Sequence, residues 1–193
     1  MDPKPKRVET PVEGLPPLQR HIATHDAAGT SVYVPTPPPQ QYIRLPGTGG
    51  VARSWAVGAV PAKLEGDADM KAYLAEDGAT SWTSPSIVTP NGVNSMIVDL
   101  EPGGVSDMHR TVSIDFSICV IGEILHELDG GETVLLKPGV STLVLLSFAM
   151  NCLAFIGGID TIPLFLGSPT PNSWSNLSCL PARALTQIAV NSA

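Results

Sequence analysis

Residues 102–139 read PGGVSDMHRTVSIDFSICVIGEILHELDGGETVLLKPG, and this stretch decides the fold. Its apolar runs are short, and Gly or Pro interrupts each of them, which predicts three short strands joined by tight turns. The alternating run 123–128 followed by Asp-Gly-Gly-Glu at 129–132 is typical of a β-hairpin. We therefore expect an all-β structure in this region.

Two residues of this stretch can bind a divalent metal ion. His109, Thr111 and Asp115 occur at a period of two, which places them on one face of an extended strand. His109 offers a nitrogen ligand and Asp115 an oxygen ligand. A mononuclear centre with open positions for substrate needs three protein ligands, so a third has to come from elsewhere. The alternative is that His109 and Asp115 are a hydrogen-bonded pair that lines a barrel.

Composition restricts the class of protein. The 193 residues suit one domain with a buried core, and the 19 Pro and 18 Gly favour short strands and turns over helices. The net charge of −7, without a cluster of Lys or Arg, argues against nucleic acid and anionic membranes as partners. The three cysteines lack the spacing of metal ligands, and the N-terminus lacks the apolar core of a signal peptide. We therefore expect a cytoplasmic protein.

The chain divides into three expected regions. Residues 1–18 are polar and Pro-rich and predict a flexible N-terminal lead-in. Residues 19–139 predict the main domain, with a hairpin at 21–34, strands at 51–57 and 92–100 and one short helix at 66–77. Strands that recur every 8–12 residues or so, separated by turn signals, are typical of an antiparallel barrel or sandwich.

The third region, 140–193, differs in composition from the rest. It is apolar and holds only two charged residues, Asp160 and Arg183. The uncharged run 138–159 is long enough for a membrane helix. Asn151, Gly157 and Gly158 weaken such a helix and no basic flank follows it, so we expect no membrane span. Buried strands are the alternative for this segment.

The spacing of Gly103, His109, Asp115 and Gly122 resembles the first motif of the cupin superfamily. In that motif the pattern is G, five residues, H-x-H, three or four residues, E, six residues, G; here Thr111 replaces the second His and Asp115 the Glu. The variant in this chain has H-R-T and then D in the motif. It is preceded by P-G-G and followed by G-E, E-L-D-x-G-E and L-x-P-G. This arrangement is similar to a group of small fungal cupins. That group also opens with L-P-P, T-H-D and G-x-S-V, found here at 15–17, 24–26 and 29–32. The resemblance covers residues 12–139 and implies a cupin jelly-roll β-barrel.

The resemblance also implies a metal site whose third ligand is missing here. It makes His109 and Asp115 ligands of Fe, Mn or Zn, with Thr111 hydrogen-bonded to a ligand and Arg110 in an outer salt bridge. The second cupin motif should begin at 138–139 and supply another histidine, but no histidine follows His126. Only His21, His25 and His126 are left as substitutes.

Two explanations fit this break after residue 139. Residues 140–193 either complete the barrel of a cupin that has lost its metal, or they are a translated intron or a frame-shifted exon. The change to Val140-Ser141 directly after Gly139 is what a retained intron would encode. A spliced transcript that still encodes residues 140–193 would exclude the second explanation.

The fold alone does not indicate a function, because one fold hosts many activities. The expected function therefore depends on the resemblance to the fungal group. Members of the fungal group are encoded in polyketide clusters, and some are described as cupin-domain oxidoreductases that act in making salicylaldehyde-type aromatics. We therefore expect a metal-dependent oxidoreductase that acts on an aromatic polyketide intermediate. A cupin decarboxylase, dehydratase or isomerase and a metal-free binding protein are the alternatives. A Gly-rich dinucleotide motif is absent, so no NAD site is expected. By analogy with small cupins, a homodimer paired through a sheet edge is expected.

Overall fold

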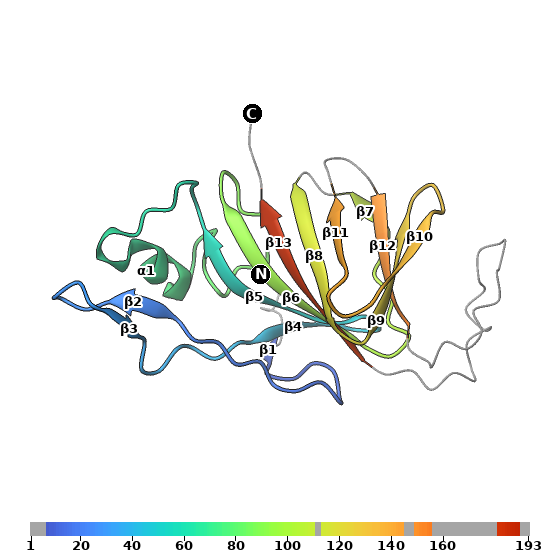
Figure 1. Cartoon of the computed structure of the whole chain (residues 1–193), viewed down its shortest axis with the longest axis horizontal. Helices are drawn as coiled ribbons and strands as arrows, with labels where there is room; N and C mark the ends of the chain where they lie inside the picture. Colours follow the sequence, from blue (N-terminus) through green and yellow to red (C-terminus); the bar gives the residue numbers. More distant parts are fainter. Residues whose placement is uncertain (1–6, 111–112, 145–148, 156–180, 190–193) are drawn as a thin grey trace.

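The structure is a computed structural model that describes residues 7–110, 113–144, 149–155 and 181–189 (Figure 1). Its largest part is a seven-stranded antiparallel sheet with the strand order β1-β4-β5-β6-β13-β8-β11. Its strands are β1 (Arg7–Val8), β4 (Tyr42–Leu45), β5 (Gly49–Val57), β6 (Val93–Leu100), β13 (Ala182–Ala189), β8 (Ile114–Ile121) and β11 (Ser141–Val144).

A four-stranded antiparallel sheet has the order β10-β9-β12-β7. Its strands are β10 (Thr133–Leu136), β9 (Glu123–Leu128), β12 (Ala149–Phe155) and β7 (His109–Arg110). A separate hairpin joins β2 (Ala23–His25) to β3 (Ser31–Tyr33) and projects from the body of the molecule (Figure 1). One 3₁₀ turn (Glu65–Asp67) leads into the single described helix, α1 (Ala68–Leu74).

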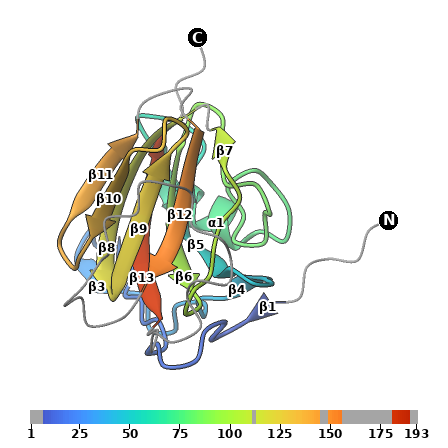
Figure 2. The same ribbon diagram turned by 90° about the vertical axis from the view of Figure 1, so that its right-hand side faces the viewer.

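The four-stranded sheet faces the seven-stranded sheet, and the core lies between them (Figure 2). The large sheet contributes Leu100 on β6, Cys119 on β8 and Ala184 on β13, and the small sheet contributes Ile124 on β9 and Leu136 on β10. The predicted all-β jelly-roll architecture is confirmed. The described strands form two facing sheets, and no closed barrel is found among them.

The predicted hairpins and strands of residues 19–139 are largely present. The turn before β10 closes with Leu128 N–H donating to the Glu132 carbonyl at 2.9 Å, and Gly131 there has a φ of 83°. The helix is shorter than predicted from 66–77. Gly66 and Asp67 both have left-handed backbone angles, and Ala75 is extended, so the helix can begin only at Ala68 and ends at Leu74.

The predicted flexible lead-in of residues 1–18 is wrong for residues 7–15. Arg7 and Val8 pair with β4, and Val12 and Leu15 are buried. A Cβ atom added to Gly14 would lie 3.3 Å from Cγ of Pro181, so this segment packs closely against the chain leading into β13. Apolar residues spaced among the prolines cover the outer face of the large sheet, and this burial holds the segment in place.

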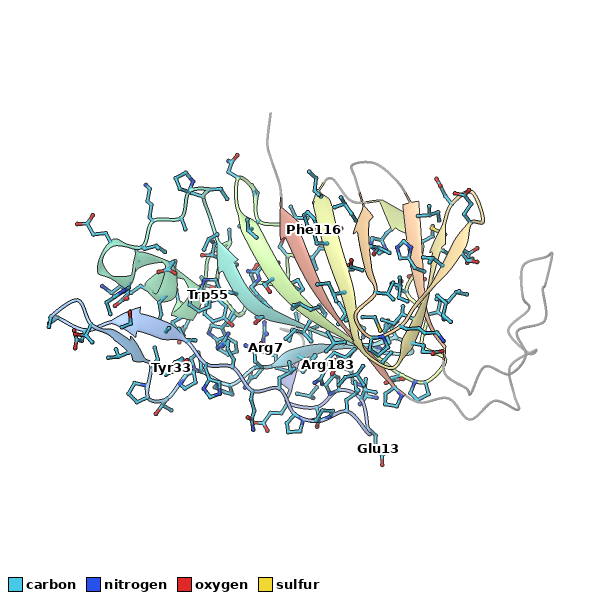
Figure 3. The ribbon with its side chains drawn as sticks, viewed as in Figure 1. Arg7, Glu13, Tyr33, Trp55, Phe116 and Arg183 are labelled. Carbon is cyan, nitrogen blue, oxygen red and sulfur yellow. The ribbon has the colours of Figure 1, made fainter. Side chains whose placement is uncertain are left out.

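In the described part of the region after residue 139, three strands are present, and they join both sheets. β11 pairs with β8, and β12 pairs with β9 and β7. β13 lies between β6 and β8 and pairs with both along its length. Arg183 on β13 forms a buried bidentate ion pair with Asp99 on β6, with Nε–Oδ1 and Nη2–Oδ2 distances of 2.6 and 2.7 Å. Figure 3 shows Arg183 at the start of β13. Among the described residues, no helix is long and apolar enough to cross a membrane.

Candidate functional site between the two sheets

The predicted ligands His109 and Asp115 lie on different sheets. His109 belongs to β7 at the edge of the small sheet, and Asp115 belongs to β8 of the large sheet. The prediction that they share one face of a single strand is wrong, because the chain crosses from one sheet to the other between 110 and 114. Thr111 lies outside the described residues. Arg110 pairs through its backbone with Ala149, and its side chain is outside the described part of the structure.

His109 lies at an exposed position that faces the space between the sheets. It is the register partner of Met150, which is in turn the partner of Leu128 on β9. Residues directly opposite each other in a ladder share one face, so His109 lies on the face that carries Ile124 and His126. Its Nδ1 is 2.8 Å from the Asp107 carbonyl oxygen. In the tautomer that makes this hydrogen bond, Nε2 is left as the acceptor.

Asp115 is buried on the inner face of the large sheet. Its side chain is only 5% exposed, and it has the same strand parity as the core residue Cys119. The Ser113 hydroxyl donates to Asp115 Oδ1 at 2.6 Å. This bond holds the carboxyl group in one orientation.

His126 is a candidate site residue whose orientation the sequence leaves open. It lies on β9 two residues after the core residue Ile124 and is 5% exposed. Its Nε2 atom is buried without a hydrogen-bond partner among the described residues. Burial lowers the pKa of the imidazole. At neutral pH His126 is therefore an uncharged side chain with an unused ring nitrogen facing the interior.

Thr142 on β11 adds a second unused polar atom, on the inner face of the large sheet. It is the register partner of Ser117, which lies between Asp115 and Cys119 on β8. Its buried Oγ1 has no hydrogen-bond partner in the described part of the chain. No sequence signal identifies Thr142, because its position depends on pairing between β11 and β8. His126, by contrast, shares the two-residue alternation of β9 with Ile124.

The described residues do not complete a metal centre. No group of three or more His, Cys, Asp or Glu side chains among them is arranged to hold one ion. His109 and Asp115 would supply two ligands, and one Asp115 oxygen already accepts a hydrogen bond from Ser113. Their donor set therefore falls one ligand short of the three that a mononuclear site of this kind requires.

Comparison with known proteins gives the family. Oryzines biosynthesis cluster protein J of Aspergillus oryzae is 32% identical over 130 residues, which are 67% of this chain and 70% of that protein. The cupin-domain-containing oxidoreductase virC of Hypocrea virens is 30% identical over 130 residues, 67% of this chain and 63% of virC. The chain belongs to this family of fungal cupin-domain proteins. Phomopsin biosynthesis cluster protein D of Diaporthe leptostromiformis is 39% identical over 126 residues, and the match spans 62% of each protein. The cupin thus spans about three fifths of that relative's length.

No protein-family model matches the cupin. Among solved structures, a putative ethanolamine utilization protein Q from Salmonella typhimurium overlaps with 90% of the chain and 96% of that protein, at a TM-score of 0.43 and 10% identity. An RmlC-like cupin from Shewanella frigidimarina overlaps with 51% of the chain and 67% of that protein, at a TM-score of 0.36 and 13% identity. The family assignment rests on the sequence relatives.

Proposed function

We propose that this cupin is an oxidoreductase of fungal secondary metabolism that binds a small aromatic substrate between its two sheets. The observation that carries the proposal is the similarity to virC, supported by two further relatives named cupin-domain-containing oxidoreductases, fogC and srdB. The polar residues on the inner faces give such a substrate hydrogen-bonding groups in an otherwise apolar interior. An aromatic polyketide intermediate is the substrate class that the motif resemblance favours.

His126 has the properties of a proton acceptor in this proposal. A neutral imidazole with an unused ring nitrogen can take the proton of a substrate hydroxyl group as an oxidation begins. Thr142 Oγ1 can hydrogen-bond the substrate oxygen. Asp115, which Ser113 holds in one orientation, supplies a carboxyl group on the large-sheet side of the site. It stays a candidate metal ligand together with His109.

The metal dependence implied by the resemblance stays a prediction. The described residues supply at most two ligands, so no step of the reaction is assigned to a metal here. A cytoplasmic location and a homodimer are further expectations of the proposal. The outer face of β8 exposes Phe116 and Ile118, an apolar surface that a second copy would cover.

The test of the proposal is turnover of 2-hydroxybenzyl alcohol to 2-hydroxybenzaldehyde, followed by chromatography. This oxidation removes two electrons and two protons, so separate arms supply dioxygen or NAD⁺ as the acceptor. We expect the wild type to form the aldehyde and His126→Gln to be slower by about 100-fold or more, because a general base contributes on that order. His25→Gln, which changes an exposed histidine of β2, is the matched control and should retain the activity. Absence of aldehyde in every arm, or equal rates in both variants, would contradict the proposal.

A reaction without net redox change is the second candidate, and His126 is the observation that favours it. Isomerisation, dehydration and decarboxylation depend on proton transfer, which an uncharged buried imidazole can perform without an added electron acceptor. If the cupin converts a β-hydroxy carbonyl compound to its dehydrated product at the same rate with and without dioxygen or NAD⁺, this candidate replaces the oxidoreductase.

A further inference from the structure

The loop that follows α1 binds a buried arginine. Residues 81–86 of this loop read SWTSPS. Arg53 of β5 is 5% exposed, and its guanidinium group donates to the carbonyl oxygens of Ala79, Ser81 and Ser86. Among the described residues, no carboxylate forms an ion pair with it. A positive charge is thus surrounded by carbonyl oxygens without a counter-ion, although buried charges in proteins are usually paired.

A second arginine without a counter-ion binds the same loop from the N-terminal segment. Arg7 of β1 is partly buried and donates to the carbonyl oxygens of Trp82 and Thr83 at 3.2 and 2.6 Å. A guanidinium group has five N–H donors, so three are left after these two bonds. Its positive charge, after burial itself, contributes to the lowered pKa of Arg53. Two like charges therefore lie close together here, in a chain whose net charge is −7.

Ser84 carries a hydroxyl group whose proton forms no hydrogen bond in the described structure. The other hydroxyl groups of the loop, those of Ser81, Thr83 and Ser86, donate to backbone carbonyl oxygens. Ser84 Oγ only accepts a long hydrogen bond of 3.4 Å from the Ser86 N–H. Ser84 directly follows Thr83, whose carbonyl oxygen binds Arg7, so a group attached to Ser84 Oγ is within reach of the remaining Arg7 donors.

The chain around Ser84 has the features that a proline-directed protein kinase recognises. Pro85 follows Ser84 directly and is exposed. Residues 84–86 belong to no helix or strand, so this segment can enter a kinase cleft as an extended chain. A Ser-Pro pair on an irregular surface loop is the local structure that such a kinase requires.

The other Thr-Pro pairs of the described chain lack one of these features. The pair at 10–11 has a buried proline, and the pair at 89–90 has a threonine that is only 1% exposed. The pair at 36–37 has an exposed threonine, but no arginine side chain in the described structure donates to either residue. The pair at 36–37 is therefore the matched control for Ser84.

We propose that Ser84 is a phosphorylation site for a proline-directed protein kinase, and that Arg7 binds the phosphate and so fastens the N-terminal segment to the loop. A bond forms between Ser84 Oγ and the γ-phosphorus of ATP, the bond from that phosphorus to the β,γ-bridging oxygen breaks, and ADP leaves. The hydroxyl proton passes to the base of the kinase. The phosphate carries a charge of about −1.5 to −2 and three acceptor oxygens. It gives this pair of arginines a counter-ion, and the site is independent of the proposed function.

The first experiment locates the modification. The purified full chain is incubated with ATP and an active cyclin-dependent kinase or mitogen-activated protein kinase, in separate reactions, and phosphate is located by peptide mass spectrometry. We expect one phosphoryl group on Ser84, absent from Ser84→Ala and retained in Thr36→Ala. An unmodified Ser84 with both kinases, or phosphate on Thr36 in place of Ser84, would overturn the proposal.

The second experiment tests whether Arg7 binds the phosphate. The melting temperature with phosphate is compared with that without phosphate inside each variant, so a lower stability of Arg7→Met itself does not affect the result. We expect phosphorylation to raise the melting temperature of the wild type by about 2–4 °C, as one charge-assisted hydrogen bond of a partly exposed group does in a chain of this size. Arg7→Met should show no rise, and Arg44→Met, which changes an exposed arginine of β4, should respond like the wild type. Ser84→Ala treated in the same way measures the effect of phosphate elsewhere.

The phosphorus NMR signal of the phosphoserine gives a readout that does not depend on stability. The second phosphate pKa, ordinarily about 6, should be lowered in the wild type, because the guanidinium group favours the dianion. It should return to the ordinary value in Arg7→Met. No rise in melting temperature in the wild type, or the same rise and the same phosphate titration in the wild type and Arg7→Met, would overturn the role of Arg7.

Discussion

Replacing Arg183 by Met should destabilise the protein strongly, because it leaves a buried carboxylate without its partner. The Asp99 side chain is 0% exposed and that of Arg183 is 8% exposed, and two hydrogen bonds of 2.6 and 2.7 Å join them. Removal of one member of such a buried pair costs about 3–5 kcal/mol. For a domain of this size, that loss lowers the melting temperature by roughly 6–20 °C.

The chain provides a matched control in its exposed pair of Arg44 and Glu101. Their closest N–O distance is 3.0 Å, but their side chains are 55% and 27% exposed. Solvent screens such a pair, so Arg44→Met should cost less than about 1 kcal/mol. The assay is urea unfolding of both variants and the wild type, followed by circular dichroism.

This comparison tests whether β13 belongs to the native fold. If residues 181–189 were an aberrant reading, Arg183 would have no native partner and both Met variants would unfold like the wild type. Equal unfolding free energies for Arg183→Met and Arg44→Met would therefore refute the placement of β13 between β6 and β8. The double variant Asp99→Asn, Arg183→Met should recover part of the loss, because no unpaired charge stays buried.

Four further predictions follow from the same structure. Burial lowers the pKa of His126, so the unfolded chain binds a proton at this residue more readily than the folded chain does. The free energy of unfolding should therefore be highest above about pH 6.5 and fall as the pH falls below that value. His126→Gln should flatten this pH dependence in unfolding titrations. Gly122→Ala should cost more than about 1–2 kcal/mol, because φ is 75° and an added Cβ would lie 2.7 Å from the Pro181 carbonyl oxygen; Gly130→Ala, where nothing lies within 4 Å, is the control, and equal thermal stability of the two variants would contradict this reasoning. If the predicted metal site exists, elemental mass spectrometry should find about one equivalent of Fe, Mn or Zn in the wild type and less in His109→Ala, whereas a metal-free wild type would contradict metal dependence. If the protein dimerises through the outer face of β8, Phe116→Glu should shift it to the monomer in analytical ultracentrifugation, and an unchanged sedimentation coefficient would argue against that face.

Local patterns made much of the fold predictable. The alternation of 123–128 and the Asp-Gly-Gly-Glu turn after it determine β9, the hairpin and β10, because turn chemistry and strand period act over a few residues. The short helix was also predicted, but its start was not. Gly66 and Asp67 both take left-handed angles there, which acidic residues near a helix start do not indicate.

Long-range pairing limited what the sequence could show of the site. A period of two continues from His109 to Asp115, so nothing local indicates that β7 and β8 belong to different sheets. Leu125 and Leu128 lie on opposite faces of β9, so apolar neighbours alone could not orient His126. Its inward position depends on packing of Ile124 against residues from the other sheet. The place of β13 depends on contacts across more than eighty residues, as the Asp99–Arg183 pair shows.

The most direct test of the interior site is the imidazole nitrogen spectrum of His126, recorded against pH with and without 2-hydroxybenzaldehyde. The assignment comes from the signal lost in His126→Gln. The account predicts a neutral ring that titrates below the ordinary histidine pKa of about 6.5 and an Nε2 signal that shifts when the aldehyde is added. A ring that titrates at or above about 6.5, with no response to the aldehyde, would contradict the central claim that His126 faces a binding site between the two sheets.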